Sequence, residues 1–566
     1  MGINHGKNTE MEPTGATQRI QSGIIRSLFG SASVVPIPRD KSLRFDESES
    51  KIESASPMQS FLVSLNAIGV LGLLIHSSNL RAGDQPQWGE RGSRNMISRE
   101  RHLPDTFDPT SGVNIKWIIP LGTETHSTPV VSDGRVYIGT NNGNERDPKH
   151  RGDRGVLMCV DEKGGQLLWQ LVVPKREEDP YLDWPNTGIA SAATVDKDRV
   201  YIVSNRGEVI CLDARGMANG NGGPFGQEGA HMTQKGTAQL EPGALDADIL
   251  WIYDMVSEAG IWTHDGAHSS ILVDGPYLYV NTGTGVDNTH RKVRTPDAPS
   301  LIVLDKTTGR LVARDREGIA PHIFHCTWSS PSIGDLSGRK VIFFAGGNGI
   351  VYAFDPVPSL GPKAGSNGAL KKLWQYDFDP AGPKEDVHRF TSNRREGPSN
   401  IYGMPVYKNG RLYVAGGGDL WWGKNEAFLK CVSAVGTGDV TTTATIWTYP
   451  LEKHCLSTPA IHDGMVFMAD SGKRVHCVDA ATGKPFWSHE AKGDFWASPM
   501  VADGKVYIGT RRGDFLILEA SRKKRLLASI ELGSPISGSA TPANGVVYVA
   551  TMTQLYAVAQ GAKLER

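Results

Sequence analysis

Histidine, aromatic and charged side chains recur at equivalent places in this sequence, each just ahead of a short apolar run. His126, His268, Trp328, Tyr402 and Trp496 occupy one such place, and runs such as STPVVSDGRVYIGT follow them. Aromatic surfaces with a few converging polar groups are the usual lining of a small-ligand pocket. These five residues therefore predict a ligand site, provided that the fold gathers the repeats around one centre.

Polar residues near these positions extend the candidate site. They lie two residues earlier or on the turns expected to face them: Glu124, Asn400, His454 and Asp494, and Asn142, Arg206, Asn348 and Arg511. Glu124 and Asp494 would form an acid–base or metal-binding pair only at a suitable separation. The alternative is that all these side chains simply fill a central channel. The sequence therefore assigns no catalytic residue and no metal ligand.

The six cysteines favour packing over chemistry. Four of them occupy the same place in four repeats, as small buried apolar residues do: Cys159, Cys211, Cys431 and Cys477. Cys326 and Cys455 follow histidines in the segments HCTWSSP and HCLSTP. With His322 and His325 they offer a metal site as an alternative, but the spacing fits no established zinc pattern. We expect packing or lining of the channel.

The apolar runs themselves predict the elements that position these residues. About eight copies contain two alternating runs around a tight turn, often Asp-Gly or Asn-Gly, which is the strongest short signal for a β-hairpin. A second turn, as in MCVDEKGGQLLW and HCVDAATGKPFW, adds two further strands to most copies. Four antiparallel strands per repeat are typical of a propeller blade.

The two ends of the repeat region predict how the ring closes. The segment NIKWIIPL around Trp117 reads as a lone strand, and the last repeat ends at YAVAQ without a fourth strand of its own. Pairing these two segments would remove exposed sheet edges. The fold class is therefore all-β: an eight-bladed β-propeller of four-stranded antiparallel blades, closed by pairing of the N- and C-terminal segments.

The sequence ahead of the repeats has a different character. Residues 1–57 are polar and Ser-rich, which predicts a disordered N-terminal extension, and Met58 is an alternative start. Residues 58–82 contain the apolar run 61–75 followed by a polar stretch, as in a signal peptide or a membrane anchor. The propeller is expected over residues 88–560. We therefore expect an extracytoplasmic protein, periplasmic or secreted, that contacts a membrane only through an uncleaved anchor.

The charge and repeat pattern limit the partners. The formal net charge is −1, so the chain lacks the basic character of a nucleic-acid-binding protein. We expect a monomer that binds a protein partner or a small ligand such as a carbohydrate.

The second turns also carry a family resemblance. An Asp and Gly followed by Trp, as from Asp161 to Trp169 and from Asp479 to Trp487, resembles the repeats of the pyrroloquinoline-quinone-like (PQQ-like) propeller superfamily. The resemblance implies that such tryptophans dock between adjacent blades. They are Trp117, Trp169, Trp251, Trp374, Trp447 and Trp487. The third repeat departs, with Val312 and Ala313 where Trp is expected.

The resemblance is less specific for activity, because one fold hosts many functions. The superfamily contains quinone- and Ca²⁺-dependent dehydrogenases, whose alcohol-oxidising members use two adjacent cysteines, and scaffold proteins of outer-membrane assembly. Here no two cysteines are adjacent and no C-x-x-C-H haem motif occurs, so PQQ and Ca²⁺ are cofactors without motif support. The first cysteine, Cys159, lies too far along the chain for lipidation at a mature N-terminus.

The favoured hypothesis is an exported PQQ-like propeller that acts as a binding or scaffold protein at its central funnel. The alternatives are a PQQ- and Ca²⁺-dependent oxidoreductase, and an extracytoplasmic lyase or hydrolase of polysaccharide. The adjacent tryptophans Trp421 and Trp422 are interpreted as a blade cap or a partner-facing patch.

Overall fold

The computed structural model describes residues 83–176, 182–266, 268–358 and 368–564. The chain divides into two units, residues 1–75 and 76–566, and all described residues belong to the second. The predicted extension 1–57 and the signal or anchor at 58–82 lie outside the described residues. In the described part, no helix is long and apolar enough to cross a membrane.

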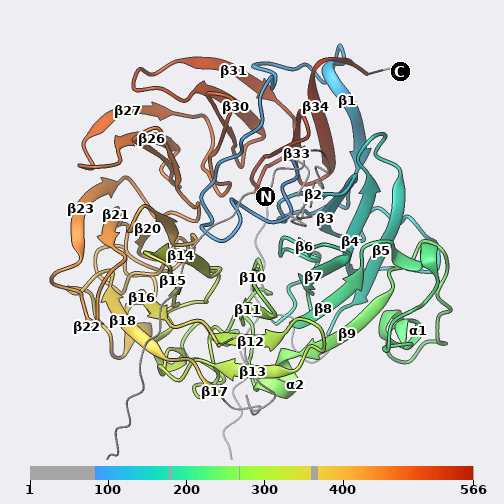
Figure 1. The fold of residues 1–566 in the computed structure, drawn as a ribbon, viewed down its shortest axis with the longest axis horizontal. Helices are drawn as coiled ribbons and strands as arrows, with labels where there is room; N and C mark the ends of the chain where they lie inside the picture. The colour runs from blue at the N-terminus through green and yellow to red at the C-terminus, as the bar shows by residue number, and fades with distance from the viewer. Residues whose placement is uncertain (1–82, 177–181, 267, 359–367, 565–566) are drawn as a thin grey trace, which may run out of the picture. The chain divides into compact units, whose positions relative to one another are not determined.

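The described residues form eight β-sheets, each with four antiparallel strands, arranged as the blades of a propeller (Figure 1). This confirms the predicted fold class. Blade 1 contains β2 (Val130–Ser132), β3 (Arg135–Asn141), β4 (Arg154–Asp161) and β5 (Leu167–Pro174). Blade 2 contains β6 (Thr194–Asp196), β7 (Arg199–Val203), β8 (Glu208–Asp213) and β9 (Ile249–Asp254). Blade 3 contains β10 (Leu272–Asp274), β11 (Tyr277–Asn281), β12 (Leu301–Asp305) and β13 (Leu311–Arg314).

The remaining blades follow in chain order. Blade 4 contains β14 (Ser332–Leu336), β15 (Arg339–Ala345), β16 (Ile350–Phe354) and β18 (Lys372–Asp377). Blade 5 contains β19 (Val406–Lys408), β20 (Arg411–Gly417), β21 (Ala427–Ser433) and β23 (Thr445–Leu451). Blade 6 contains β24 (Ala460–His462), β25 (Met465–Ala469), β26 (Arg474–Asp479) and β27 (Pro485–Glu490). Blade 7 contains β28 (Met500–Ala502), β29 (Lys505–Gly509), β30 (Asp514–Glu519) and β31 (Leu526–Glu531).

Blade 8 joins the two ends of the repeat region. Its strands are β32 (Thr541–Ala543), β33 (Val546–Ala550), β34 (Gln554–Lys563) and β1 (Val113–Pro120). β1 pairs antiparallel with β34, with Trp117 opposite Ala557 and Ile119 opposite Leu555. The predicted closure of the ring is therefore confirmed.

A few short elements lie between or beside these strands. β17 (Gly368–Ala369) extends blade 3 and β22 (Gly438–Asp439) extends blade 4, each in parallel. The helices are α1 (Glu228–Met232) and α2 (Met255–Ala259), and the 3₁₀ turns are η1 (Gly216–Asn219), η2 (Ala320–His322) and η3 (Val387–Phe390).

The hairpins form because their turns hold residues that accept positive φ. Asp133 and Gly134 have φ of 49° and 74°, and Asp503 and Gly504 have φ of 50° and 68°. Two successive positive φ values define the turn whose twist matches that of paired strands. The first two strands of these blades are therefore fixed by local sequence.

Adjacent blades are joined by tryptophans on the outer strands. Each of six indole Nε1 atoms donates a hydrogen bond of 2.8–3.2 Å to a backbone carbonyl of the next blade. The pairs are Trp117 with Glu162, Trp169 with Ala214, Trp251 with Lys306, Trp374 with Ala434, Trp447 with Ala480, and Trp487 with Ser521. Each indole thus satisfies its polar atom while its ring stays buried.

The segment 83–100 crosses the centre of the ring, a role that the sequence did not reveal (Figure 1). Its backbone or side chains bond to the inner strand, or the residues just before it, in every blade. The contacts are Val131, Val195, Ser270, Ile333, Tyr407, Ile461, Val501 and Pro542, in order of blade. We call residues 83–100 the central segment. It links the inner edges of all eight blades through hydrogen bonds.

Arg94 of the central segment is fully buried, with 0% exposure. Its guanidinium donates to the carbonyl oxygens of Trp88, Ser270 and Pro331 and to the Ser270 hydroxyl, at 2.8–3.1 Å. Burial lowers the pKa of Arg94 to about 9. The planar fork of an arginine suits such a ring of oxygens, and here it ties blades 3 and 4 to the centre.

Candidate functional site

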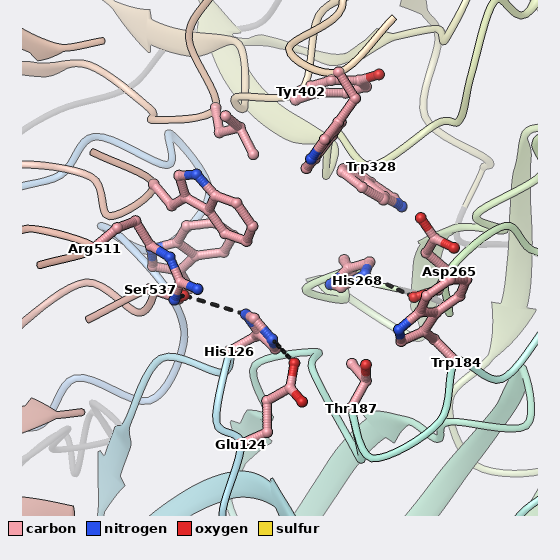
Figure 2. A pocket seen from close by; sticks show the side chains of 14 residues that line it. Glu124, His126, Trp184, Thr187, Asp265, His268, Trp328, Tyr402, Arg511 and Ser537 are labelled. Atoms are coloured by element: carbon pink, nitrogen blue, oxygen red, sulfur yellow. Dashed lines mark hydrogen bonds and ion pairs between the residues drawn. The ribbon is translucent and has the colours of Figure 1, made fainter. Parts of the chain in front are cut away.

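A pocket of about 270 Å³ lies at the centre of the propeller, where the inner strands begin (Figure 2). We call it the funnel pocket. Loops of several blades line it, and Trp88 of the central segment contributes to it as well. Its lining consists of Trp88, Glu124, His126, Trp184, Thr187, Asp265, His268, Trp328, Tyr402, Trp421, Leu456, Trp496, Arg511 and Ser537.

Aromatic rings form a continuous belt around one side of this pocket. The ring centroids of Trp496 and Trp421 are 5.8 Å apart, those of Trp421 and Trp328 are 5.7 Å apart, and both pairs are edge-to-face. Trp328 also contacts Tyr402 at 5.0 Å and His268 at 4.8 Å. Such pairs hold one another in place, so the belt is a preformed apolar surface.

A chain of polar groups adjoins the belt at Trp496, whose ring stacks with that of His126 at a centroid distance of 6.0 Å. His126 bonds through Nε2 to Glu124 at 2.8 Å and through Nδ1 to Ser537 at 3.2 Å (Figure 2). Arg511 donates to the same Ser537 hydroxyl at 2.5 Å, and its guanidinium lies 4.3 Å from the centre of the Trp496 ring. A cation over an indole face is attracted by the ring quadrupole, which orients this arginine beside the pocket.

Three buried polar atoms of the lining are left without hydrogen-bond partners among the described residues. They are the indole Nε1 atoms of Trp328 and Trp496 and the Oδ1 atom of Asp265. An unsatisfied buried donor or acceptor costs free energy comparable to its lost hydration. The lining therefore contains two donors and an acceptor that have no hydrogen-bond partner among the described residues.

Burial shifts the titration of the groups in this pocket. It raises the pKa of Asp265 to about 6 and lowers the pKa of His268 to about 4. It also lowers the pKa of Arg511. At neutral pH, His268 is consequently an uncharged imidazole, and Glu124 and Asp265 give the lining two carboxylates for the single guanidinium of Arg511.

Seven of the residues that the sequence singled out line the funnel pocket together. They are Glu124, His126, His268, Trp328, Tyr402, Trp496 and Arg511. Leu456 and Ser537, which hold the same position in their repeats, line it too.

The other candidates lie outside this lining. Asn142 donates to the carbonyl oxygen of His150 at 2.7 Å, which holds the loop between β3 and β4. Asn348 donates to the hydroxyl of Tyr352 at 2.9 Å, within the turn between β15 and β16. Both asparagines are buried and stabilise turns.

Arg206 and Asp494 also have partners away from the pocket centre. Arg206 forms an ion pair with the buried Glu208, at 3.3 Å. The backbone carbonyl of Asp494 accepts a hydrogen bond from the backbone N–H of Arg511, at 2.9 Å. Asp494 therefore shapes the turn that presents Arg511.

Asn400 and His454 stand behind Tyr402, one layer from the pocket. The Asn400 amide donates to the Tyr402 hydroxyl at 2.8 Å, and the His454 ring lies edge-on to Tyr402 at 5.0 Å. Burial lowers the pKa of His454 to about 4. These two residues support a lining residue.

The sequence missed five residues of the lining: Trp88, Trp184, Thr187, Asp265 and Trp421. Trp88 belongs to the central segment, and the others lie on loops where the repeats differ in length. Trp421 was interpreted as a cap or a partner-facing residue, whereas it faces the pocket. The signal that could have found Trp184 and Trp421 is the density of tryptophan in non-repeating loops.

The cysteines are all buried and free of disulfides. Burial raises the pKa of Cys455 to about 12 and that of Cys326 well above its usual value, so both thiols stay protonated at neutral pH. His322 bonds to the carbonyl oxygen of Lys384. His325 instead lies in a cluster with His264 and His290.

The residues of the funnel pocket do not fit PQQ with Ca²⁺. PQQ is a tricarboxylate, and the charged lining side chains are two carboxylates and one guanidinium. Trp328 and Trp496 offer flat faces, and the two carboxylates could balance Ca²⁺, but Arg511 is then the single Arg or Lys side chain of the lining for the three acid groups of PQQ.

The fold and the pocket define the class of this protein: an eight-bladed propeller that holds an aromatic site where its inner strands begin. A family model described as outer membrane protein assembly factor BamB, built on the PQQ-like repeat, matches residues 153–220 and 432–558. The matched residues lie in the repeats that resemble the PQQ-like β-propeller superfamily, and the match supports that resemblance.

Solved structures show the same fold at low sequence identity. A europium-containing methanol dehydrogenase is 12% identical, with a TM-score of 0.54, and the match covers 84% of this chain and 98% of that one. BamB from Moraxella catarrhalis is 13% identical, with a TM-score of 0.46, over 80% of this chain and 99% of that one. A search of curated proteins found no match. The methanol dehydrogenase thus shares the fold, and the function must be argued from the site.

Proposed function

We propose that this protein binds a small saccharide or a similar polyol in the funnel pocket. The observation that carries the proposal is the set of unsatisfied polar atoms beside aromatic faces. Trp328 and Trp496 each present a ring and a free indole N–H among the described residues, and Asp265 presents a free carboxylate oxygen. A sugar offers apolar C–H faces for the rings, and hydroxyls that both donate and accept.

The charge of the lining favours neutral ligands over acidic ones. Glu124 and Asp265 outnumber Arg511, so an acidic ligand would meet net repulsion. A pocket of about 270 Å³ is small for a drug-sized molecule. It suits one or two sugar rings. We therefore expect neutral mono- or disaccharides to bind more tightly than uronates of the same size.

We further propose that the protein acts outside the cytoplasm, with residues 58–82 as a signal peptide or anchor. The apolar run 61–75 supports this. The matching family model, named for an outer membrane assembly factor, supports it as well.

The binding proposal is tested by isothermal titration calorimetry of the full chain against neutral saccharides and the matching uronates. Trp328→Ala and Trp496→Ala should weaken binding of the best neutral sugar at least about tenfold, because each removes a stacking face and a donor. Trp262→Ala is the matched control, since Trp262 is a partly buried tryptophan outside the pocket lining. Binding that survives both pocket substitutions would refute the proposed site.

A further inference from the structure

Three histidines from separate loops converge behind the wall of the funnel pocket. His264 precedes β10, His290 follows β11, and His325 precedes β14. Each offers one ring nitrogen, and the three atoms lie within 4.8 Å of one another. The Nε2 atoms of His264 and His290 are 3.1 Å apart. We call these residues the histidine cluster.

The backbone holds two of these histidines side by side. The segment 283–286 bonds on one side to Trp262, through the Gly285 N–H at 3.2 Å, and on the other to His325, through the Val286 N–H at 2.9 Å. A Cβ added at Gly285 would lie 2.7 Å from the His264 Cβ and 2.7 Å from the His325 carbonyl oxygen. Only glycine permits this approach, so the spacing of His264 and His325 is built into the fold.

Hydrogen bonds fix the orientation of two of the three imidazole rings. His264 Nδ1 lies 3.0 Å from the carbonyl oxygen of Val286, which can only accept, so Nδ1 carries the proton. His325 Nδ1 lies 3.0 Å from the Asp419 carboxylate. His264 Nε2 therefore carries the lone pair and faces His290 Nε2, and His325 Nε2 is buried with no hydrogen-bond partner among the described residues.

We infer that the histidine cluster binds a divalent transition metal ion, with Zn²⁺ as the best fit, through the three imidazoles. Two nitrogens at the usual 2.0–2.1 Å from a tetrahedral zinc are roughly 3.3 Å apart, close to the separation of His264 and His290. A histidine that binds a metal through one ring nitrogen usually donates the N–H of the other to a carboxylate or a backbone carbonyl, as His325 and His264 do here. The proposal goes beyond the saccharide site and does not depend on it.

Asp265 connects the histidine cluster to the funnel pocket. His290 and Asp265 adopt left-handed backbone conformations, with φ of 55° and 58°. Such conformations are uncommon outside glycine and gather at functional sites. Asp265 lies with Oδ2 3.5 Å from His264 Nε2, and it also lines the funnel pocket. A metal held here would lie next to a bound ligand.

A second group of possible ligands lacks these features. Asp147, His150 and Asp246 also lie close together. Lys149, however, forms ion pairs with both aspartates, so their charge is already balanced. This group is interpreted as a structural ion-pair network.

The inference is tested by titrating the chelator-treated full chain with Co²⁺, without saccharide, and recording its visible absorption. We expect a saturable band at one equivalent per chain, and its loss on addition of Zn²⁺. His290→Ala should weaken Co²⁺ binding at least tenfold. Because His290 is only partly buried, this variant should keep the wild-type circular dichroism and melting temperature.

His476→Gln is the matched control. His476 is also buried and bonds to a carboxylate, Asp470, at 3.0 Å, but it lies in blade 6. It should leave the band unchanged, while His325→Gln should abolish it. Absence of a saturable band in the wild type, or an unchanged band in folded His290→Ala, would overturn the inference. Neither result bears on the saccharide proposal, which the calorimetric titrations test independently.

Discussion

Gly483 lies directly against the indole of Trp447, so closely that a Cβ added at Gly483 would come within 2.7 Å of the ring. The same indole donates to the carbonyl of Ala480, at 3.1 Å. The tryptophan of blade 5 therefore packs against the glycine of the second turn in blade 6. Gly165 and Gly309 have the same relationship to Trp117 and Trp251. This explains why the repeat pairs a glycine with a tryptophan.

Replacing this glycine should cost more stability than the backbone alone explains. Gly483 and Gly504 have nearly equal positive φ, 71° and 68°, but nothing lies within 4 Å of a Cβ at Gly504. Both alanine variants should lose about 1 kcal/mol from backbone strain. Gly483→Ala should lose about 2 kcal/mol more, because it displaces Trp447. Guanidinium denaturation measures both, and equal losses would contradict docking through this contact.

The central segment should be essential to the stability of the ring. Arg94→Lys keeps the charge but cannot supply the four hydrogen bonds of the guanidinium, so we expect a loss of about 3 kcal/mol. Arg91→Lys is the control, since Arg91 is 45% exposed and pairs with Asp196 at the surface. It should change stability by less than about 0.5 kcal/mol. The free energies come from denaturant titration, and a loss for Arg94→Lys no larger than that for Arg91→Lys would contradict a stabilising role of the buried guanidinium.

Most of the fold could be predicted because its signals are local. The Asp-Gly turn of Asp503 and Gly504 specifies a hairpin within a few residues, and repetition of such turns gives the blade count. The closing strand around Trp117 was predictable because the last repeat lacks a fourth strand of its own. The central segment was not, since its contacts with eight inner strands follow no repeat. Nothing near Arg94 in sequence shows that its partners are Ser270 and Pro331.

Acid should weaken the protein through Glu208. Burial raises the pKa of this carboxyl. The charges of His231 and Arg206 and a hydrogen bond from Ser204 outweigh that effect and bring the pKa down to about 2. Because the folded pKa lies below the ordinary value of 4.5, Glu208 contributes stability above about pH 4.5. That contribution is lost as the pH falls toward 2.

Substitution of Glu208 isolates this effect. Glu208→Gln should lower the free energy of unfolding at pH 7 by on the order of 1–3 kcal/mol and flatten its decline between pH 4.5 and 2. Glu519→Gln, in the surface pair with Arg525, should leave the profile unchanged. Unfolding monitored by circular dichroism over this pH range decides the matter, and a wild-type slope in Glu208→Gln would exclude Glu208 as its source.

The candidate site was predictable only where it follows the repeats. His126, Trp328 and Trp496 occupy one position of the aligned repeats. That position lies just before the inner strand of each blade, and the inner strands surround one centre. Asp265 and Trp421 lie on loops whose length and conformation are particular to one blade. The histidine cluster was missed for the same reason, because backbone pairing around Gly285 brings together residues that share no motif.

PQQ with Ca²⁺ should not bind in the funnel pocket. We expect no saturable change in the quinone absorption spectrum and no rise in melting temperature, because the lining has two carboxylates and one guanidinium to meet a tricarboxylate. The measurement is a spectral titration of the full chain. A saturable change that disappears in Trp328→Ala and Trp496→Ala would instead restore the dehydrogenase hypothesis.

The most direct test of the central claim is tryptophan fluorescence of the full chain during titration with neutral saccharides, in the presence of a soluble quencher. Five tryptophans line the funnel pocket: Trp88, Trp184, Trp328, Trp421 and Trp496. A bound sugar should shield the accessible ones, so the account predicts a saturable loss of quenching that is greatly reduced in Trp496→Ala. Unchanged quenching with every saccharide up to millimolar concentration would contradict it.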